Sequence, residues 1–433
     1  MTQQQHSWPL VVVGAGAAGV TAAIFAGRQG VPVLVLDGRR HPGAKIRASG
    51  GGRCNVLPSE ARLDDFFTQG SANTLRNVLS SWPLPQVRHF FEQELGLPLR
   101  REETGKLFPV SDDARDVVRV LMTELARVHG ILRAGSRVVG VDRQQGLWRL
   151  SLADGGVEWA QRVILATGGL SMPTTGSDGA GLRLAQELGH TLVPTAPALV
   201  PLTGHHPDLT GLSGVSCEVS LTATAPSGAT RTVTGSMLFT HKGYSGPAVL
   251  DISQFVVGGP ANIPMAALHA GFGAPCAHPA GHPDSWQQRL GRSGSKTVWT
   301  VVREALPRRL ADALVASAGL GQGGGADGRA SELPKEARKR LLGALTACPL
   351  PVSGSEGYRT AEVTTGGVSL DEVVGRTLES RRCPELYLTG EMLDVTGKLG
   401  GYNFLWAWAS GRKAGLSAAA SYHRAAGAAA QAS

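Results

Sequence analysis

A glycine-rich turn near the N-terminus constrains this chain more than any other feature. Residues 10–13 (LVVV) form a short β-branched run, and residues 14–19 (GAGAAG) follow it directly. An Ala-rich stretch then closes at Gly30, and a second apolar run ends at Asp37. This order of strand, glycine turn, helix and strand is typical of a dinucleotide-binding βαβ unit. We therefore expect an α/β fold of the Rossmann type.

The residues of this turn have separate expected tasks. Gly14 permits the tight turn, Gly16 removes a side chain that would block the phosphates, and Gly19 lets the helix pack near the strand. The helix N-terminus, which includes Ala18, offers N–H donors and a favourable dipole to a pyrophosphate. A carboxylate at Asp37 can accept hydrogen bonds from both ribose hydroxyls.

The turn alone does not distinguish FAD from NAD. Arg39 and Arg40 lie just past the second strand and could bind a 2′-phosphate, although arginines at a strand end are more often solvated.

A second glycine-rich segment, GAKIRASGGGRCN, covers residues 43–55. Consecutive glycines are costly in conformational entropy, so they indicate a place where backbone presses against a ligand. Lys45 and Arg53 would oppose phosphate charge there, while the alternative is a mobile surface loop. Cys54 is either a reactive thiol near a flavin or a small packed thiol, and we favour packing.

The third informative stretch lies at residues 385–415. A short strand leads to Glu391, and Gly400 and Gly401 precede Tyr402 and Asn403 at the start of an apolar helix. Such a helix N-terminus near the pyrimidine edge of an isoalloxazine would stabilise the reduced, anionic flavin. We expect this helix to end around residue 411.

The sequence gives weaker evidence for catalytic residues than for cofactor-binding residues. His241, Lys242 and Tyr244 lie in a predicted turn, LFTHKGYSGP. They either face the flavin and bind or protonate substrate, or they stabilise a strand-to-helix turn. The two interpretations remain open.

Composition limits the other function classes. A net charge of +8 favours an anionic small-molecule substrate, whereas the chain has no run of five basic residues, so nucleic acid is an unlikely partner. The five cysteines form no CxxC pair, which disfavours a redox disulfide or a zinc site. We expect no metal, since the histidines at 205, 206, 269, 278 and 282 are irregularly spaced.

The N-terminal residues lack the basic region and apolar core of a secretory signal, and no stretch reaches the length of a membrane span. We therefore expect a cytoplasmic chain without membrane contact. The oligomeric state does not follow from the sequence.

A length of 433 residues implies two or three domains. The pattern predicts a discontinuous nucleotide-binding domain over residues 1–190 and 352–433. Between these parts we expect a β-rich inserted domain at 191–257 and a partly flexible, helical insert at 258–351, which includes the Gly-rich segment 321–328.

These motifs resemble a bacterial family of NAD(P)/FAD-dependent oxidoreductases that includes aminoacetone-oxidase and bile-acid-reductase-like flavoproteins. The resemblance rests on SGGGRCN, LATGGLSMPTTGSDGAG, EVTTGGV and GEMLDVTG followed by GGYN. It implies a glutathione-reductase-like FAD-binding domain with an inserted β-barrel-like domain and a helical segment. Two features depart from the family: Asp37 stands where Glu is usual, and Val56 and Leu57 stand where Thr-Asn is usual.

The resemblance also implies residue roles. The AMP half of FAD would lie on the first turn and Asp37, and the flavin half on the two later motifs. The full set of expected cofactor contacts is Gly14, Gly16, Ala18, Gly19, Asp37, Lys45, Gly50, Gly51, Arg53, Cys54, Asn55, Thr167, Gly168, Gly390, Glu391, Gly400, Gly401, Tyr402 and Asn403.

The expected function is an oxidoreductase with non-covalent FAD that transfers hydride between a small organic substrate and flavin N5. An amine or aminoketone oxidase competes with an NAD(P)H-dependent reductase. A second nicotinamide-binding turn is absent from the sequence, so NAD(P)H would bind transiently. A non-catalytic or RNA-associated FAD-binding protein is the alternative class.

Overall fold

The computed structural model describes residues 7–258, 263–264, 266–279, 281–282, 284–321 and 323–432. The chain divides into two compact units, Met1–Thr195 with Glu362–Ser433, and Ala196–Ala361. Each unit has its own hydrophobic core.

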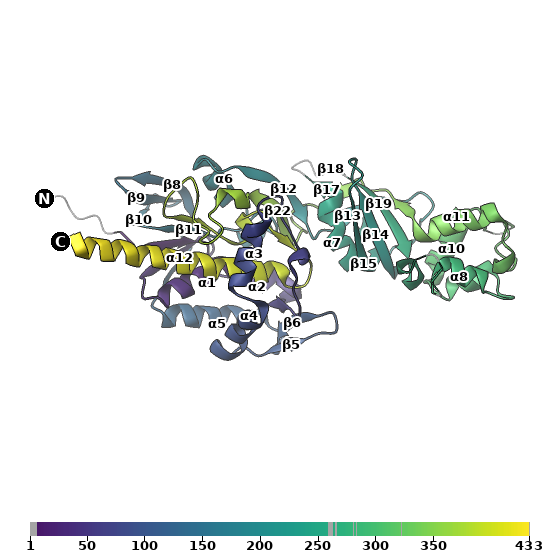
Figure 1. The fold of residues 1–433 in the computed structure, drawn as a ribbon, viewed down its shortest axis with the longest axis horizontal. Helices are drawn as coiled ribbons and strands as arrows, with labels where there is room; N and C mark the ends of the chain where they lie inside the picture. Colours follow the sequence, from purple (N-terminus) through teal and green to yellow (C-terminus); the bar gives the residue numbers. More distant parts are fainter. Residues whose placement is uncertain are drawn as a thin grey trace. The chain divides into compact units, whose positions relative to one another are not determined.

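A five-stranded parallel sheet forms the centre of the first unit (Figure 1). Its order is β23 (Leu386–Leu388), β11 (Val163–Leu165), β1 (Leu10–Val13), β2 (Val33–Asp37) and β7 (Ile131–Ala134). All four strand pairs are parallel. All residues of β1 are buried, as expected for a parallel strand covered on both faces. The predicted Rossmann-type fold is confirmed.

Helix α12 (Tyr402–Ala432) runs along α1 (Ala17–Gly27), and Figure 1 shows the two side by side. A Cβ atom at Gly411 would overlap the carbonyl oxygen of Ala18, and one at Gly415 would overlap that of Ala22. Glycines one turn apart therefore let the two backbones touch. The expectation that the helix ends near Gly411 was wrong, because this glycine permits close packing and does not cap the helix.

Smaller elements complete the first unit. Its other helices are α2 (Ala44–Ala48), α3 (Ala72–Ser81), α4 (Leu84–His89), α5 (Ala114–Arg127) and α6 (Ala180–Glu187). Its antiparallel strands are β3 (Leu57–Pro58), β5 (Leu99–Arg101) and β6 (Lys106–Pro109) in one sheet, β8 (Val138–Gln144), β9 (Leu147–Leu152) and β10 (Val157–Ala160) in a second, and β4 (Phe66–Phe67) with β24 (Thr396–Gly397) in a third.

Two paired strands, β12 (Leu192–Ala198) and β22 (Val363–Val368), lie where the chain leaves the first unit and returns to it. The first unit therefore continues to residue 195 and resumes at 362, where the sequence suggested limits of 190 and 352.

The second unit contains a seven-stranded antiparallel sheet. Its order is β20 (Cys348–Leu350), β19 (Ala267–Phe272), β14 (Ser216–Thr224), β15 (Thr230–Phe239), β16 (Gly243–Ser245), β13 (Leu202–Thr203) and β21 (Gly354–Ser355). Its helices are α7 (Pro247–Val256), α8 (Trp286–Gly291), α9 (Val298–Arg303), α10 (Arg308–Ser317) and α11 (Lys335–Thr346), and the strands β17 (Val257–Gly258) and β18 (Ile263–Pro264) form a short pair.

The segments 191–257 and 258–351, which the sequence separates, share this unit. The second segment supplies β19 and β20, and β19 pairs along β14. Its sequence, ALHAGF, has no β-branched residue, so the pattern gave no strand signal. The Gly-rich segment 321–328 is packed at Ala326, which is buried and whose N–H donates to the carbonyl of Leu320. Among the described residues, no helix combines the length and hydropathy that crossing a membrane requires.

Candidate functional site

The predicted cofactor residues gather at one edge of the parallel sheet. The first glycine-rich turn follows β1, and Asp37 is the last residue of β2. Thr167 follows β11, and Glu391 follows β23. Since these strands are parallel, their carboxyl ends lie at the same edge, which is where open α/β sheets bind ligands.

The three glycines of the first turn serve different purposes. A Cβ at Gly14 would lie 2.5 Å from the carbonyl oxygen of Ala166, and one at Gly19 would overlap the carbonyl oxygen of Gly14. Both positions exclude side chains for packing reasons. A Cβ at Gly16 would meet no protein atom within 4 Å, so only this glycine leaves space for a ligand at the start of α1. Ala18 packs instead against Gly390, where an added Cβ would lie 2.8 Å from the Ala18 Cβ.

Asp37 holds the glycine-rich turn. One carboxylate oxygen accepts a bond of 2.6 Å from the N–H of Ala15, and the other accepts one of 2.7 Å from the N–H of Arg39. Burial raises the pKa of this carboxyl group, against the lowering effect of the two backbone donors. A carboxylate offers about four acceptor positions, so room remains for ribose hydroxyls.

A cavity of about 610 Å³ begins at the residue after Asp37. Four basic side chains contribute to its wall, which suits a ligand with negative charge. The lining residues are Gly38, Arg39, Arg40, His41, Ala44, Arg47, Thr174 and Thr175. Arg39 and Arg40 therefore line a cavity and are also exposed to solvent.

Lys45 and Glu391 form an ion pair, with the Lys45 Nζ atom 2.6 Å from Glu391 Oε2. Ser171, which is fully buried, bonds both: its Oγ accepts from Lys45 at 2.8 Å and donates to Glu391 Oε1 at 2.8 Å. The charge of Lys45 is thus balanced within the protein, and Ser171 is a site residue that the sequence did not indicate.

The second glycine-rich segment is also ordered by its own contacts. Arg53 pairs with Glu102 at 2.6 Å, and its guanidinium carbon lies 4.2 Å from the ring centroid of Phe108. Cys54 is fully buried, and burial raises the pKa of its thiol to about 12. The thiol therefore stays protonated, which supports the packed rather than the reactive interpretation.

Two features of this segment suit a ligand. Gly51 has a φ of +68°, and a Cβ there would meet no protein atom within 4 Å, whereas one at Gly50 would touch the Phe108 ring at 3.0 Å. The Oδ1 atom of Asn55 is buried and has no hydrogen-bond partner among the described residues. An open glycine backbone beside an unsatisfied acceptor fits the donor groups of a flavin or its ribityl chain.

Thr167 and Gly168 have packing roles. The Thr167 N–H donates to the sulfur of Met392 at 3.4 Å, and a Cβ at Gly168 would lie 2.6 Å from the Ser177 hydroxyl. Gly390, on the adjacent strand end, is held by α12: its N–H donates to Ser410 Oγ, and its carbonyl accepts from Trp406 Nε1 at 3.0 Å. A direct cofactor contact by these residues stays a prediction.

The start of α12 is fixed by neighbours within the first unit. A Cβ at Gly401 would lie 2.5 Å from the carbonyl carbon of Leu57, so this glycine is required by packing against β3. Asn403 binds Gly397 twice, accepting from its N–H at 2.8 Å and donating to its carbonyl at 2.9 Å. Tyr402 lies edge-on to Phe66. A flavin contact at Gly400 and Gly401 would therefore come from the helix N–H groups and not from side chains.

The weak catalytic candidates belong to the second unit. His241 and Lys242 are exposed, and Lys242 lies 3.8 Å from Glu356. Tyr244 is 2% exposed and packs edge-on against Phe239, and burial raises the pKa of its hydroxyl. Tyr244 is therefore a core residue, which favours the structural interpretation of this turn.

Among the described residues, one group has metal-ligand chemistry: His278, His282 and Asp284, whose ligand atoms lie within 4.8 Å of one another. The two imidazoles stack at 4.1 Å with an interplanar angle of 8°. The His282 Nδ1 atom accepts from the N–H of Asp284. Parallel rings cannot both direct a nitrogen at one ion, so stacking and a turn account for the group.

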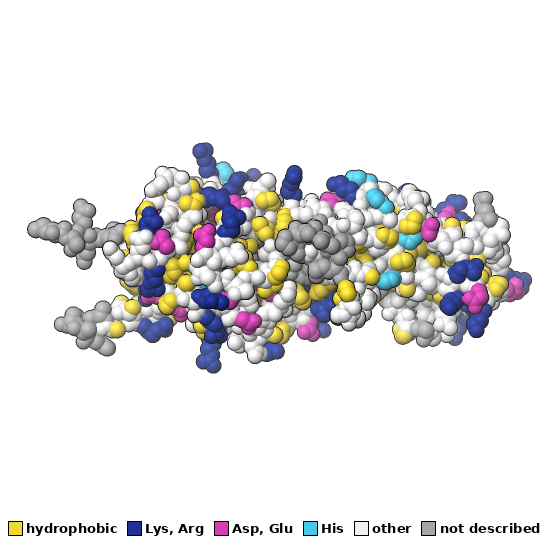
Figure 2. All heavy atoms as spheres, turned by 90° about the horizontal axis from the view of Figure 1, so that it is seen from above, with side chains coloured by type: hydrophobic (Ala, Val, Ile, Leu, Met, Phe, Trp, Pro, Cys, Tyr) yellow, Lys and Arg dark blue, Asp and Glu magenta, His cyan; other side chains and the backbone are white. Residues whose placement is uncertain are grey.

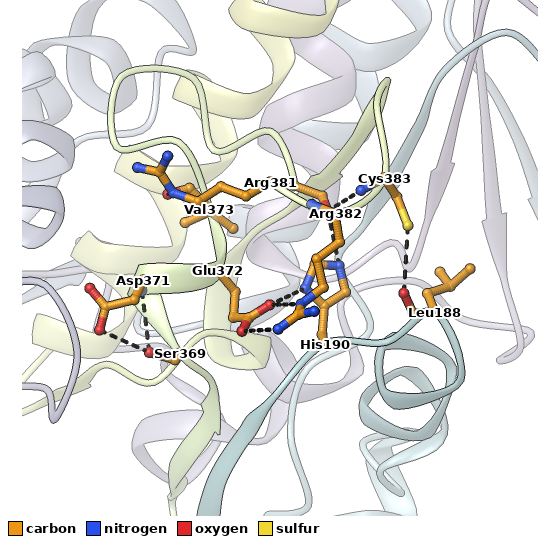
Figure 3. Close-up of polar contacts among 10 residues, drawn as sticks. Leu188, His190, Ser369, Asp371, Glu372, Val373, Arg381, Arg382 and Cys383 are labelled. Atoms are coloured by element: carbon orange, nitrogen blue, oxygen red, sulfur yellow. Dashed lines mark hydrogen bonds and ion pairs between the residues drawn. The ribbon is translucent and has the colours of Figure 1, made fainter.

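A polar network around the buried side chain of His190 lies outside the sheet edge, and the sequence did not predict it (Figure 3). His190 Nε2 lies 3.0 Å from Ser380 Oγ, and His190 Nδ1 lies 3.3 Å from Glu372 Oε2. Arg382 donates to both oxygens of Glu372. The order Ser, His, Glu resembles a hydrolase triad, but Ser380 Oγ already accepts the N–H groups of Arg382 and Cys383. The network is therefore structural.

Residues 8–417 match the model of the HI0933-like protein Rossmann domain. The chain is 34% identical to a ribosomal RNA dihydrouridine synthase of Escherichia coli, covering 92% of this chain and 95% of that protein. It is also 34% identical to a 3-dehydro-bile acid delta(4,6)-reductase of Clostridium scindens, covering 94% and 98%.

A solved structure of a flavocytochrome c3 fumarate reductase in its open conformation matches 97% of this chain and 79% of its own, with 18% identity and a TM-score of 0.49.

Proposed function

The chain belongs to the HI0933-like family of FAD-dependent oxidoreductases, and within that family we propose that it reduces a carbon–carbon double bond conjugated to a carbonyl group. NAD(P)H is the proposed electron donor. The net reaction adds a hydride to the β-carbon and a proton to the α-carbon of the substrate, while NAD(P)H becomes NAD(P)⁺. Bound FAD supplies the hydride-transfer chemistry between donor and substrate.

The proposal is supported by the reactions that the names of two relatives state. Dihydrouridine is uridine whose ring double bond has gained two hydrogens, and this bond is conjugated to a carbonyl. A delta(4,6)-reductase acting on a 3-dehydro bile acid likewise reduces double bonds next to a ketone. The substrates of these two relatives differ in size, but both reactions reduce a carbon–carbon double bond that is conjugated to a carbonyl group. An amine or aminoketone oxidase has no comparable support among these relatives.

The residues at the sheet edge suit the cofactor half of this reaction. Gly16 and Gly51 leave open space beside the backbone, Asn55 presents an unsatisfied acceptor, and Glu391 presents a fixed carboxylate. Cys54 is buried with a raised pKa, so it does not offer a thiolate for electron transfer. Hydride exchange at the flavin is then the simplest route for two electrons.

The substrate class is a choice between a small ring enone and a uracil ring in RNA. The sequence disfavours nucleic acid, whereas two relatives, from Escherichia coli and Haemophilus influenzae, are named for ribosomal RNA. On the face shown in Figure 2, Lys and Arg side chains are spread out and mixed with Asp and Glu. The small enone is therefore the first candidate and RNA the second.

The test is product analysis without oxygen. The purified protein is incubated with NADH or NADPH and either a 3-oxo-Δ4,6 steroid or unmodified ribosomal RNA. We expect one substrate to gain two hydrogen atoms, detected by mass spectrometry, and the Gly16→Val variant to give none. If neither substrate is reduced, and a parallel sample with oxygen and an aminoketone shows oxygen-dependent conversion, the protein is an oxidase.

A further inference from the structure

We propose that Ser171 and Thr364 are cofactor-positioning residues, which fix the carboxylate of Glu391 and make FAD retention depend on β22. This strand carries the chain back from the inserted unit. The proposal rests on FAD binding, which family membership establishes, and does not depend on which substrate is reduced.

The Glu391 carboxylate is held from three directions. Oε2 accepts from Lys45 at 2.6 Å, while Oε1 accepts from Ser171 Oγ at 2.8 Å and from the N–H of Thr364 at 3.0 Å. The side chain is 17% exposed, so it is partly removed from water yet still reachable. With about four acceptor positions on a carboxylate, one remains for a ligand hydroxyl. Three protein donors leave this group a single orientation before any ligand arrives.

Thr364 organises the same place from the other side. It is 1% exposed, and its Oγ1 accepts from the N–H of Leu170 at 2.7 Å and from that of Ser171 at 3.0 Å. Its hydroxyl therefore ties the loop after β11 to the start of β22. Without that oxygen, two buried N–H groups would lose their acceptor.

Gly169 gives independent support. A Cβ at this position would lie 2.5 Å from Thr364 Oγ1 and 2.9 Å from Glu391 Oε1. The backbone at Gly169 has no positive φ that would itself demand glycine. The glycine is therefore required by the approach of Thr364 and Glu391 to this loop, and by no turn geometry.

The strand β22 begins two residues after the inserted unit ends at Ala361. At its start, the Ser171 hydroxyl lies 3.2 Å from the carbonyl oxygen of Glu362, and Thr364 follows. The first residues to return from the inserted unit are thus attached to the loop and carboxylate of the cofactor site. Loosening this attachment would release Glu391, and a ligand bound to Glu391 would tighten it.

The test uses the full chain, stripped of FAD and reconstituted. Thr364→Val removes Oγ1 and keeps the N–H, Ser171→Ala removes the bridging hydroxyl, and Thr364→Ser restores the oxygen. Thr365→Val makes the same change at the neighbouring buried residue of β22, for which no bond to Glu391 exists. The measured quantities are the Kd for FAD, the melting temperature of the FAD-free protein, and hydrogen exchange of residues 169–172 and 362–366 with and without FAD.

We expect Thr364→Val and Ser171→Ala each to raise the Kd for FAD by about tenfold, the effect of one lost hydrogen bond in a charged cluster. Thr364→Ser and Thr365→Val should bind as wild type. FAD should slow exchange at both segments in wild type and less in Thr364→Val. Wild-type affinity in both variants, or no FAD effect on exchange at 362–366, would overturn the proposal. If Thr364→Val does not fold, Ser171→Ala and the wild-type exchange decide it.

Discussion

The carboxylate of Asp37 accepts a hydrogen bond of 2.6 Å from the backbone N–H of Ala15, and so joins the end of β2 to the glycine-rich turn after β1. Asp37→Ala should therefore weaken FAD binding in two ways, by freeing the turn and by removing a ribose acceptor. We expect a loss of about 1–3 kcal/mol, measured by titration of FAD-free protein. Asp142→Ala on β8 is the control and should bind normally, because the carboxylate of this half-buried residue pairs with Arg149. Equal affinities would remove Asp37 from the site.

Substitution of Gly16 should affect FAD retention, whereas substitution of Gly19 should affect the stability of the fold. Gly16→Val should fold normally and fail to retain FAD, because its side chain enters space that no protein atom occupies within 4 Å of Cβ. Gly19→Ala should lower the melting temperature of the FAD-free protein, because its Cβ overlaps the carbonyl oxygen of Gly14. A Gly16→Val protein that copurifies with FAD would contradict this assignment of space.

From the close contact between α1 and α12 we predict an effect on the thermal stability of the protein. Gly411→Ala should lower the melting temperature, since its Cβ has no room beside Ala18. Gly427→Ala is the matched control, because this glycine is an exposed residue of the same helix with nothing near its Cβ. We expect this control to be neutral or to stabilise by up to about 1 kcal/mol. Two equally stable variants would show that the helices can separate without cost.

The network around His190 predicts a dependence on pH. Burial lowers the pKa of His190 below 6.5, so the folded protein binds its proton less readily than the unfolded chain. The stability that the neutral His190 side chain contributes should be fully present above pH 6.5. It should be lost progressively as the pH falls below that value. The Glu372 carboxyl, whose pKa the Arg382 bond lowers to about 2, adds a further loss below pH 4.5. His190→Gln should flatten the melting temperature between pH 6.5 and 5, and an unchanged slope would argue against this origin.

The sequence predicted which residues lie at the sheet edge, because the positions of Gly16 and Asp37 follow from the short-range order of strand, turn, helix and strand. It could not supply residues that act through distant partners. Ser171 and Thr364 look like ordinary loop and strand residues, and only the fold brings them to Glu391. The same limit explains the packing of Gly401 against Leu57, which the sequence did not predict, and Gly411, which suggested a helix end and instead accommodates Ala18.

Segment 258–351 shows a second limit. Its strand Ala267–Phe272 pairs along β14, and its last three residues are all buried. In the sequence, its glycine, alanine and histidine give no strand signal. Packing in the inserted unit thus decides this structure, and intrinsic propensity does not.

The most direct test of the central claim is an anaerobic spectrum of the purified protein with its two half-reactions followed separately. NADH or NADPH should bleach the oxidised flavin absorbance. Anaerobic addition of a conjugated ring enone, or of RNA that contains unreduced uridine, should restore the absorbance. This recovery should be faster than the recovery in a second reduced sample to which oxygen is admitted. A flavin that NADH and NADPH leave oxidised, or that only oxygen restores, would contradict the reductase and return the oxidase to first place.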